Sequence, residues 1–195
     1  LRKVNRIGKL LVVAPLSTLK FTWQRELFEL FPDVKSAVLH GTKKQRLALL
    51  CDPSYDIFII NHDGIKVIEE ELKKHPEIDA VAIDELAVYR NKSDRTKAMK
   101  GIAAAMKWSW GMSGSPIPHS PTDVFHQAGI ITPDRVPKYF GQFRDQLMLK
   151  INGFKYIPKD DAVERAFAVM QPAVRFTIDE VVELPECIER TIDVE

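Results

Sequence analysis

Short runs of consecutive apolar residues constrain the fold of this chain more than any other feature of its sequence. Residues 10–14, 57–60 and 80–83 are apolar at every position, which is typical of strands buried on both faces of a parallel sheet. Weaker strand patterns lie at residues 36–40 and 108–112. Helical patterns fill the intervals, at residues 17–31, 42–50, 65–74 and 92–107. Because parallel strands need crossovers, which are usually helices, the sequence predicts an α/β fold with a parallel sheet covered by helices on both faces.

The second half of the chain breaks this alternation. Helical patterns at residues 122–131 and 160–170 flank a predicted turn or hairpin at residues 153–156. Apolar and polar residues alternate over residues 176–195, as in an extended segment. We therefore expect a mixed helical and extended C-terminal extension after the sheet.

The composition indicates a folded chain but does not identify a binding partner. The 195 residues are 45% hydrophobic and 28% charged, enough for the core of one large domain. Lys and Arg number 28 against 27 Asp and Glu, so the net charge is +1 and any basic surface must be local. Cys51 and Cys187 are too few for a disulfide framework or a zinc site. Neither an apolar run of about 18 residues nor a signal-peptide pattern occurs, so we expect a soluble intracellular protein with no membrane partner.

Asp84 and Glu85 directly follow the apolar run at residues 80–83. Parallel strands end at a common edge of the sheet, where α/β proteins bind their ligands. In nucleotide hydrolases a strand-end Asp at this edge holds the magnesium of the bound nucleotide. An ordinary strand-to-helix junction also favours carboxylates, because they suit the start of a helix. The pair alone leaves both interpretations open.

A turn that carries hydroxyls, Ser113-Gly114-Ser115-Pro116, follows the next predicted strand. Gly, Ser and Pro form turns for steric reasons, so a plain loop is one interpretation. The other is that Ser113 and Ser115 hydrogen-bond the neighbouring carboxylates and orient them around a metal.

A basic segment, residues 89–97, follows the acidic pair and contains Arg90, Lys92, Arg95 and Lys97. These cations form either a solvated helix face or a phosphate-binding surface. The second interpretation rests on Arg and Lys, with hydroxyls and amides, being the usual donors to a nucleic-acid backbone.

The first helical pattern, with Ser17 or Thr18 as its cap, places Trp23 and Leu30 or Phe31 on one apolar face. Trp23 is therefore expected in the core rather than as a base-stacking platform.

Neither the histidines nor Gly8-Lys9 forms a recognisable metal or phosphate site. His40, His62 and His119 lie at no metal-ligand spacing and are expected to be structural or loop residues. Gly8-Lys9 is not a phosphate loop, because the chain lacks the earlier glycine and the following hydroxyl that this pattern needs.

In their order along the chain, these segments resemble the first RecA-like lobe of the Swi/Snf-type DNA translocases of helicase superfamily two, most closely the short phage or bacterial forms. The matching segments are residues 13–19 for motif Ia, residues 59–63 for the Ib region, Asp84-Glu85 for the DEAH box, Arg90-Asn91 for the basic segment after it, and residues 113–117 for motif III. The resemblance implies an incomplete RecA-like P-loop NTPase lobe. It assigns residues 1–132 to the first lobe, from motif Ia to motif III, and residues 133–195 to the part that leads toward a second lobe.

The resemblance implies ATP and Mg²⁺ as cofactors and DNA as the partner. Asp84 would hold the magnesium of ATP through water, and Glu85 would position or deprotonate the attacking water. Ser113 and Ser115 would couple the nucleotide state to the DNA contacts. The residues implied along the DNA backbone are Pro15, Ser17, Thr18, Asn61, Arg90 and Asn91. Such contacts give affinity without sequence readout and suit a protein that slides.

Several positions depart from the family pattern. Ala87 stands in place of the histidine of the DEAH box, His119 in place of an asparagine, and Ser113 and Ser115 in place of threonines. The phosphate-loop lysine would precede the chain, and a second lobe with an arginine finger would follow it. Because an arginine finger is worth ~10³ to 10⁵ in rate, we expect these residues alone to be inactive and the parent protein to hydrolyse ATP.

Three functions compete on this basis. The first is a partial motor lobe of an ATP-dependent DNA translocase. The second is a degenerate lobe that only binds DNA or protein, and the third is an unrelated α/β enzyme whose acidic pair binds a metal for another reaction. The resemblance places the protein in the cytoplasm of a bacterium or phage-infected cell, or in the nucleus of a eukaryote. The sequence leaves the oligomeric state and the DNA substrate open.

Overall fold

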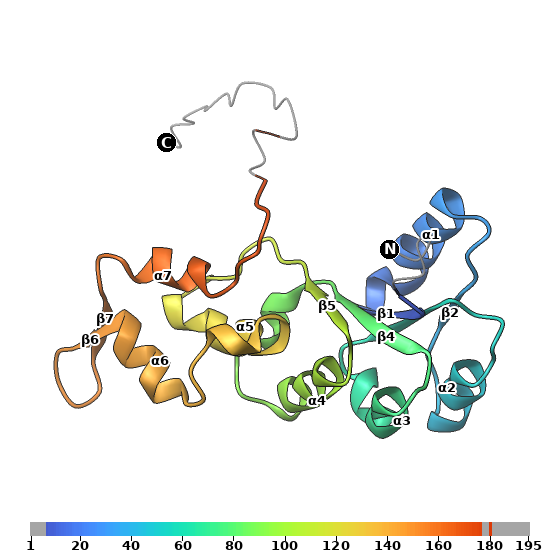
Figure 1. The fold of residues 1–195 in the computed structure, drawn as a ribbon, viewed down its shortest axis with the longest axis horizontal. Helices are drawn as coiled ribbons and strands as arrows, with labels where there is room; N and C mark the ends of the chain where they lie inside the picture. Colours follow the sequence, from blue (N-terminus) through green and yellow to red (C-terminus); the bar gives the residue numbers. More distant parts are fainter. Residues whose placement is uncertain (1–6, 177–179, 181–195) are drawn as a thin grey trace, which may run out of the picture.

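Five parallel strands form the central sheet of this chain, in the order β2-β3-β1-β4-β5 (Figure 1). The computed structural model describes residues 7–176 and residue 180. The strands of the sheet are β1 (Lys9–Ala14), β2 (Ser36–Val38), β3 (Ile57–Asn61), β4 (Ile78–Ile83) and β5 (Trp108–Gly111), and a separate antiparallel pair consists of β6 (Met148–Lys150) and β7 (Tyr156–Pro158). Because every pairing within the large sheet is parallel, its carboxyl ends lie at one edge. The predicted α/β fold is confirmed.

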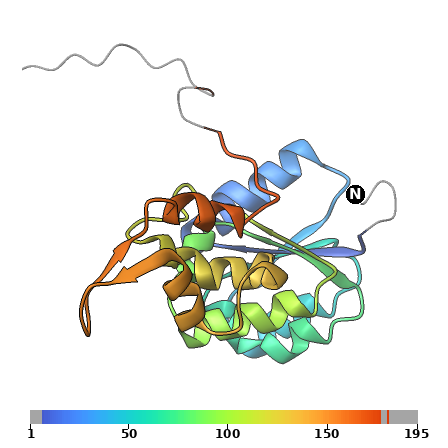
Figure 2. The ribbon, with the colours of Figure 1, turned by 60° about the vertical axis from the view of Figure 1, so that its left-hand side comes forward.

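Helices cover both faces of the sheet, as predicted. One face packs against Leu19 and Trp23 of the segment that leads into α1, and the other against Leu50, Leu72 and Met99 of α2, α3 and α4. Figure 2 shows the blue α1 on one side of the sheet and the green helices on the other. The α-helices are α1 (Arg25–Leu30), α2 (Lys43–Leu50), α3 (Glu69–Lys73), α4 (Asp94–Ala104), α5 (Val124–Ile131), α6 (Phe140–Leu147) and α7 (Ala162–Ala168). A π-helix (Leu19–Gln24) and 3₁₀ turns (Leu16–Thr18, Gly64–Val67, Leu86–Tyr89, Pro121–Asp123 and Pro133–Arg135) connect them.

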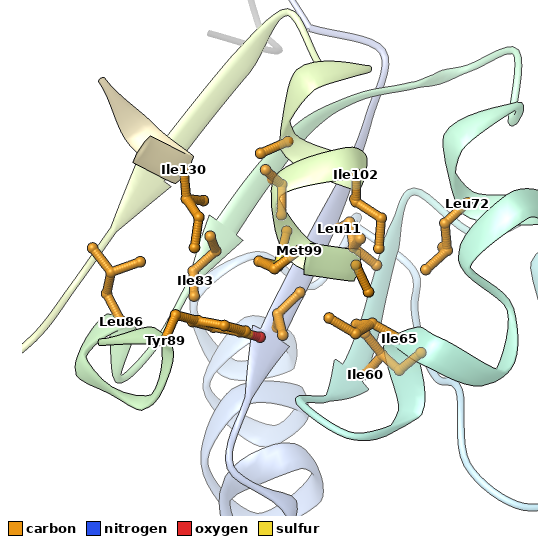
Figure 3. Packing of buried hydrophobic residues seen from close by; sticks show 14 of the residues in the cluster. Leu11, Ile60, Ile65, Leu72, Ile83, Leu86, Tyr89, Met99, Ile102 and Ile130 are labelled. Carbon is orange, nitrogen blue, oxygen red and sulfur yellow. The ribbon is translucent and has the colours of Figure 1, made fainter. Parts of the chain in front are cut away.

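Residues of the central strands alternate between the two cores. Val12 belongs to the cluster on the α1 side and Leu11 to the larger cluster on the other side, and both are 0% exposed. Figure 3 shows Leu11 in the larger cluster together with Ile60, Ile83 and Met99, which come from β3, β4 and α4. The predicted burial of the strands on both faces is therefore confirmed.

The first helix differs from the predicted one in its start and its geometry. Thr18 does not cap it; instead the Thr18 hydroxyl donates to the carbonyl oxygen of Pro15 at 3.0 Å. The π-helix that follows bonds each residue one position further along than an α-helix does, which shifts the phase of later side chains. Leu30 and Phe31, predicted on the apolar face, are accordingly 67% and 52% exposed.

Two further helices are shorter than predicted. The pattern at residues 65–74 forms a 3₁₀ turn followed by α3, because Ile68, at φ −132° and ψ 32°, leaves the helical region. This break lets Ile65 and Ile68 both reach the core at 0% exposure. α4 starts later than predicted because Ser93 caps it, its Oγ accepting a hydrogen bond from the backbone N–H of Thr96 at 3.1 Å.

The chain after the sheet packs onto the same core. Phe143 of α6 and Ala162 of α7 are 1% and 0% exposed and belong to the larger cluster. The turn or hairpin predicted at residues 153–156 is confirmed by the antiparallel pairing of β6 with β7. The predicted extended segment, residues 176–195, lies almost wholly outside the described residues. Within the described ranges, no helix is long and apolar enough to cross a membrane.

Candidate functional site

The acidic pair lies at the carboxyl edge of the sheet, between the ends of β1 and β5. The backbone N–H of Asp84 donates to the carbonyl oxygen of Val13 at 2.8 Å, so strand pairing continues up to the first carboxylate. Just after Glu85, the backbone N–H of Leu86 donates to the carbonyl oxygen of Met112 at 2.7 Å. Backbone hydrogen bonds therefore hold the pair from both sides.

Trp23 fixes the carboxylate of Asp84. The indole Nε1–H of Trp23 donates to Asp84 Oδ2 at 3.0 Å, while the half-buried ring packs against the core on the α1 side. This contact was not predicted from the sequence, which placed Trp23 in the core only. The one signal for it was the rule that a buried indole N–H needs an acceptor.

Glu85 adopts an unusual backbone conformation. Its φ of 56° and ψ of 56° lie in the left-handed region, and it is the one non-glycine residue with positive φ in the described part of the chain. Such a conformation costs an L-residue about 1–2 kcal/mol, and strain of this kind gathers at functional sites. The turn brings Leu86 over Gly111, where an added Cβ would lie 2.6 Å from Leu86 Cδ2. The Glu85 side chain is left exposed at the edge.

A buried histidine joins the end of β3 to the segment after the acidic pair. His62 is 7% exposed, and its Nδ1 lies 2.9 Å from the hydroxyl of Tyr89. Burial, reinforced by the positive charge of Arg95, lowers the pKa of His62 to about 4, while burial raises the pKa of Tyr89 above its ordinary value. His62 was expected to be structural, and its burial agrees with that role.

The four cations of the basic segment do not share one surface. Arg95 forms an ion pair with Asp63, with Nη2 2.7 Å from Oδ1. Arg90 Nη1 donates to a backbone carbonyl oxygen at 3.4 Å. Lys92 and Lys97 line two separate hollows. Lys92 and Lys97 therefore face different hollows, and Arg95 is paired with Asp63. Phosphate binding by this segment stays a prediction.

The hydroxyls predicted to orient the acidic pair do not contact it. Ser113 Oγ is buried and has no hydrogen-bond partner among the described residues, and Ser115 is exposed. Ala87, at the position where the resemblance expects a histidine, is 7% exposed, and its methyl group cannot hydrogen-bond to either hydroxyl. Asn61 Oδ1, at the end of β3, is also buried and lacks a partner in the described part of the chain. Two unpaired polar atoms thus lie near the carboxyl edge: Asn61 Oδ1 at the end of β3 and Ser113 Oγ just after β5.

The other residues implied in DNA contact follow strands at this edge or come after the acidic pair. Pro15, Ser17 and Thr18 follow β1, and Ser17 is exposed. Asn91 is exposed, and its carbonyl oxygen accepts a hydrogen bond from the hydroxyl of Thr96 at 2.6 Å. Exposure leaves the side chains of Ser17 and Asn91 accessible to a ligand.

The donor set of the edge fits magnesium bound through water. No group of three or more His, Cys, Asp or Glu that could hold a metal occurs among the described residues. Mg²⁺ usually keeps several waters and needs only one or two carboxylates. The hydrogen bond from Trp23 engages Asp84 Oδ2, so Asp84 Oδ1 and the exposed Glu85 carboxylate are the groups that would meet such a hydrated ion.

The fold and this edge together define the class of protein. A parallel sheet with helices on both faces and a strand-end acidic pair at its carboxyl edge is the architecture of a RecA-like lobe. The family model described as "SNF2-related domain" matches residues 2–195. The chain therefore belongs to the SNF2-related domain family.

A solved structure agrees with this assignment. The chain is similar to the Sulfolobus solfataricus SWI2/SNF2 ATPase core in complex with dsDNA, with a TM-score of 0.68 and 25% sequence identity. The match covers 88% of this chain and 34% of that one, so this chain spans about a third of the length of that structure. A comparison with curated proteins finds no match. The resemblance to a Swi/Snf-type first lobe is thus confirmed, whereas its phage or bacterial form stays a prediction.

Proposed function

We propose that this chain is part of an ATP-dependent DNA translocase motor and supplies the acidic pair of its ATP site. The observation that carries the proposal is the position of Asp84 and Glu85, held by backbone hydrogen bonds at the carboxyl edge of a SNF2-related sheet. The alternative of an unrelated metal enzyme has no comparable support, since family membership covers nearly the whole chain.

The two carboxylates have different chemical roles in this proposal. When bound, Mg²⁺ neutralises and polarises the phosphates of ATP. Asp84 would hold the ion through water, and the hydrogen bond from Trp23 Nε1–H to Oδ2 restrains its carboxylate. Glu85, exposed beside it, orients the attacking water and takes up its proton.

DNA contact is assigned to the loops at the same edge. Ser17, Thr18 and Asn61 lie in or directly follow β1 and β3, and Arg90 and Asn91 follow the acidic pair. Hydroxyls, amides and a guanidinium donate to phosphate oxygens without reading bases, which suits movement along DNA. The S. solfataricus protein of similar fold was solved in complex with dsDNA, as its description states.

The test is the DNA-stimulated ATPase of the natural full-length protein with Glu85→Gln. Loss of the general base is expected to lower kcat by roughly 10² to 10⁴ while DNA binding persists. Glu164→Gln is the matched control, because it makes the same chemical change at an exposed position on α7. ATP turnover at the unmodified rate in Glu85→Gln would disprove the assignment.

A non-catalytic DNA-binding lobe is the second candidate. The observations that favour it are Ala87, which is buried where the resemblance expects a histidine, and Ser113, whose Oγ has no partner among the described residues. This candidate predicts DNA binding without ATPase in the full-length protein, and an identical result for Glu85→Gln.

A further inference from the structure

A hollow of about 420 Å³ lies on elements other than those that carry the acidic pair. It is bounded by α4, α5 and the segment from Pro133 to Phe140. Its volume falls within the range of small-molecule sites. None of its lining residues is one to which the ATP site or the DNA contacts were assigned.

Three ammonium groups line this pocket without a carboxylate. They belong to Lys92, Lys100 and Lys138, and none of these forms an ion pair with the described residues. Lys100 reaches in because α5 has a glycine opposite it: a Cβ on Gly129 would lie 2.6 Å from Lys100 Nζ. Burial lowers the pKa of Lys100, and no neighbouring carboxylate offsets that cost. Lys100 Nζ and Lys138 Nζ instead lie over the rings of Phe125 and Tyr139, 5.4 and 5.5 Å from the centroids, so the pocket keeps a positive field that favours an anion.

Aromatic rings form the other part of the wall. Phe125 is 6% exposed and stands edge-on to both His126 and Phe140, at centroid distances of 5.0 and 5.4 Å. The rings of His126 and Phe140 are parallel within 6°, with centroids 6.5 Å apart. Phe140 and Tyr139 are 43% and 60% exposed, and the Tyr139 ring carries Lys138 Nζ 5.5 Å from its centroid, so exposed aromatic surface and an ammonium lie side by side in this wall.

His126 contributes its ring to the wall of the pocket. Its Nδ1 is buried and has no partner among the residues described. Burial, together with the charges of Lys100 and Lys92, lowers the pKa of His126. Both effects favour the neutral imidazole over the imidazolium.

A ligand that satisfies all of these groups must be anionic and flat at once. A simple anion leaves the exposed rings unused, and an apolar ligand leaves three lysines without a counter-charge. We propose that the pocket binds a nucleotide unit, with its base against Phe140 and Tyr139 and its phosphate at Lys100 and Lys138. The unit is either a free mononucleotide or one residue of a single-stranded nucleic acid, since both present the same base and phosphate.

Photocrosslinking locates such a ligand independently of the ATP site. The probes are 5-iododeoxyuridine monophosphate and a short single-stranded oligonucleotide that carries the same base. Irradiation of the natural full-length protein, followed by peptide mapping, is expected to place the label on the peptide that contains Tyr139 and Phe140. Labelling by both probes identifies a free nucleotide as a sufficient ligand, and labelling by the oligonucleotide alone identifies nucleic acid as the source.

Substitutions test separately the charge of Lys100, the position of its ammonium group and any general effect on the fold. Lys100→Met is expected to lower labelling about tenfold, as is Phe140→Ala, since base stacking on one ring is worth about that factor. Gly129→Ala keeps every charge but displaces the Lys100 ammonium, so it should lower labelling as well. Lys97→Met is the matched control, on the same helix but in a hollow that also contains Asp94 and acidic residues of α3.

The outcomes are distinguishable from those of the ATPase test. Asp84→Asn should abolish ATP turnover and leave this labelling unchanged. The proposal is overturned by absence of label on the peptide, by equal loss in Lys97→Met and Lys100→Met, or by competition from inorganic phosphate or a Glu-rich peptide as strong as that from the nucleotide.

Discussion

Single residues set the geometry of the acidic pair. Trp23 holds the carboxylate of Asp84 by one hydrogen bond, and Glu85 occupies a backbone conformation that suits glycine better. The hydrogen bond restrains the side chain of Asp84, and the left-handed conformation restrains the main chain at Glu85. Because one involves the side chain of Trp23 and the other the main chain of Glu85, each can be removed by its own substitution.

Trp23→Phe removes the indole N–H and keeps most of the ring packing. A hydrogen bond to a charged group is worth about 1.5–3 kcal/mol, so we expect kcat of the DNA-stimulated ATPase to fall at least about tenfold. Because Trp23 acts through Asp84, the Mg²⁺ concentration for half-maximal rate should rise as well. Trp110→Phe on β5 serves as the control. Unchanged kcat and Mg²⁺ dependence would show that the hydrogen bond has no role in catalysis.

Glu85→Gly is expected to stabilise the fold while it removes activity. Glycine adopts positive φ without the steric cost of a Cβ, although it loses more entropy on folding. The net gain should be up to about 1 kcal/mol in the free energy of unfolding, measured by urea denaturation. Glu164→Gly, in the ordinary helix α7, should instead cost about 1 kcal/mol. Equal destabilisation by both substitutions would contradict the strain at Glu85.

At the scale of elements, the end of β3 is fastened to the turn that follows the acidic pair. The hydrogen bond between His62 and Tyr89 joins these two segments, and the ion pair between Asp63 and Arg95 joins the loop after β3 to α4. A change at the β3 loop, which is assigned to DNA contact, can therefore reach the segment next to Glu85. The buried imidazole gives this connection a pH dependence.

Stability should fall on acidification through the titration of His62. The unfolded chain binds a proton near the ordinary pKa of about 6.5, whereas the folded chain does so only near pH 4. Stability is therefore full above about pH 6.5 and is lost progressively toward pH 4. Between about pH 7 and about pH 5 the loss from this group is about 2 kcal/mol. Urea midpoints of the unmodified protein and His62→Gln measure it: the variant should show a shallower dependence, and parallel curves would exclude His62 as the cause.

For the whole molecule, the sheet and the location of its site follow from local patterns. The apolar runs at residues 10–14, 57–60 and 80–83 specify buried strands on their own, and parallel strands must share an edge. That reasoning is enough to bring Asp84 and Glu85 to the carboxyl edge, as found.

The contacts at the edge could not be predicted in the same way. Trp23 and Asp84 are 61 residues apart, and His62 and Tyr89 are 27 apart, so their pairing depends on how helices dock on the sheet. The π-helix could not be predicted either, because its residues also suit an α-helix and only packing selects the wider turn. The separation of Lys92 and Lys97 into different hollows also depends on how the helices pack, which the local pattern does not specify.

The central position of β1 affects how the sheet can form during synthesis. β1 lies between β3 and β4, and its Leu10 pairs with Ile57 and Ala80, which come 47 and 70 residues later. Chains emerge from the ribosome at about 5–20 residues per second, so the first partner appears after roughly 2 to 9 seconds and the second after roughly 4 to 14 seconds. Such long-range pairing is also intrinsically slow. During synthesis, both edges of β1 therefore stay unpaired until β3 and then β4 have been made.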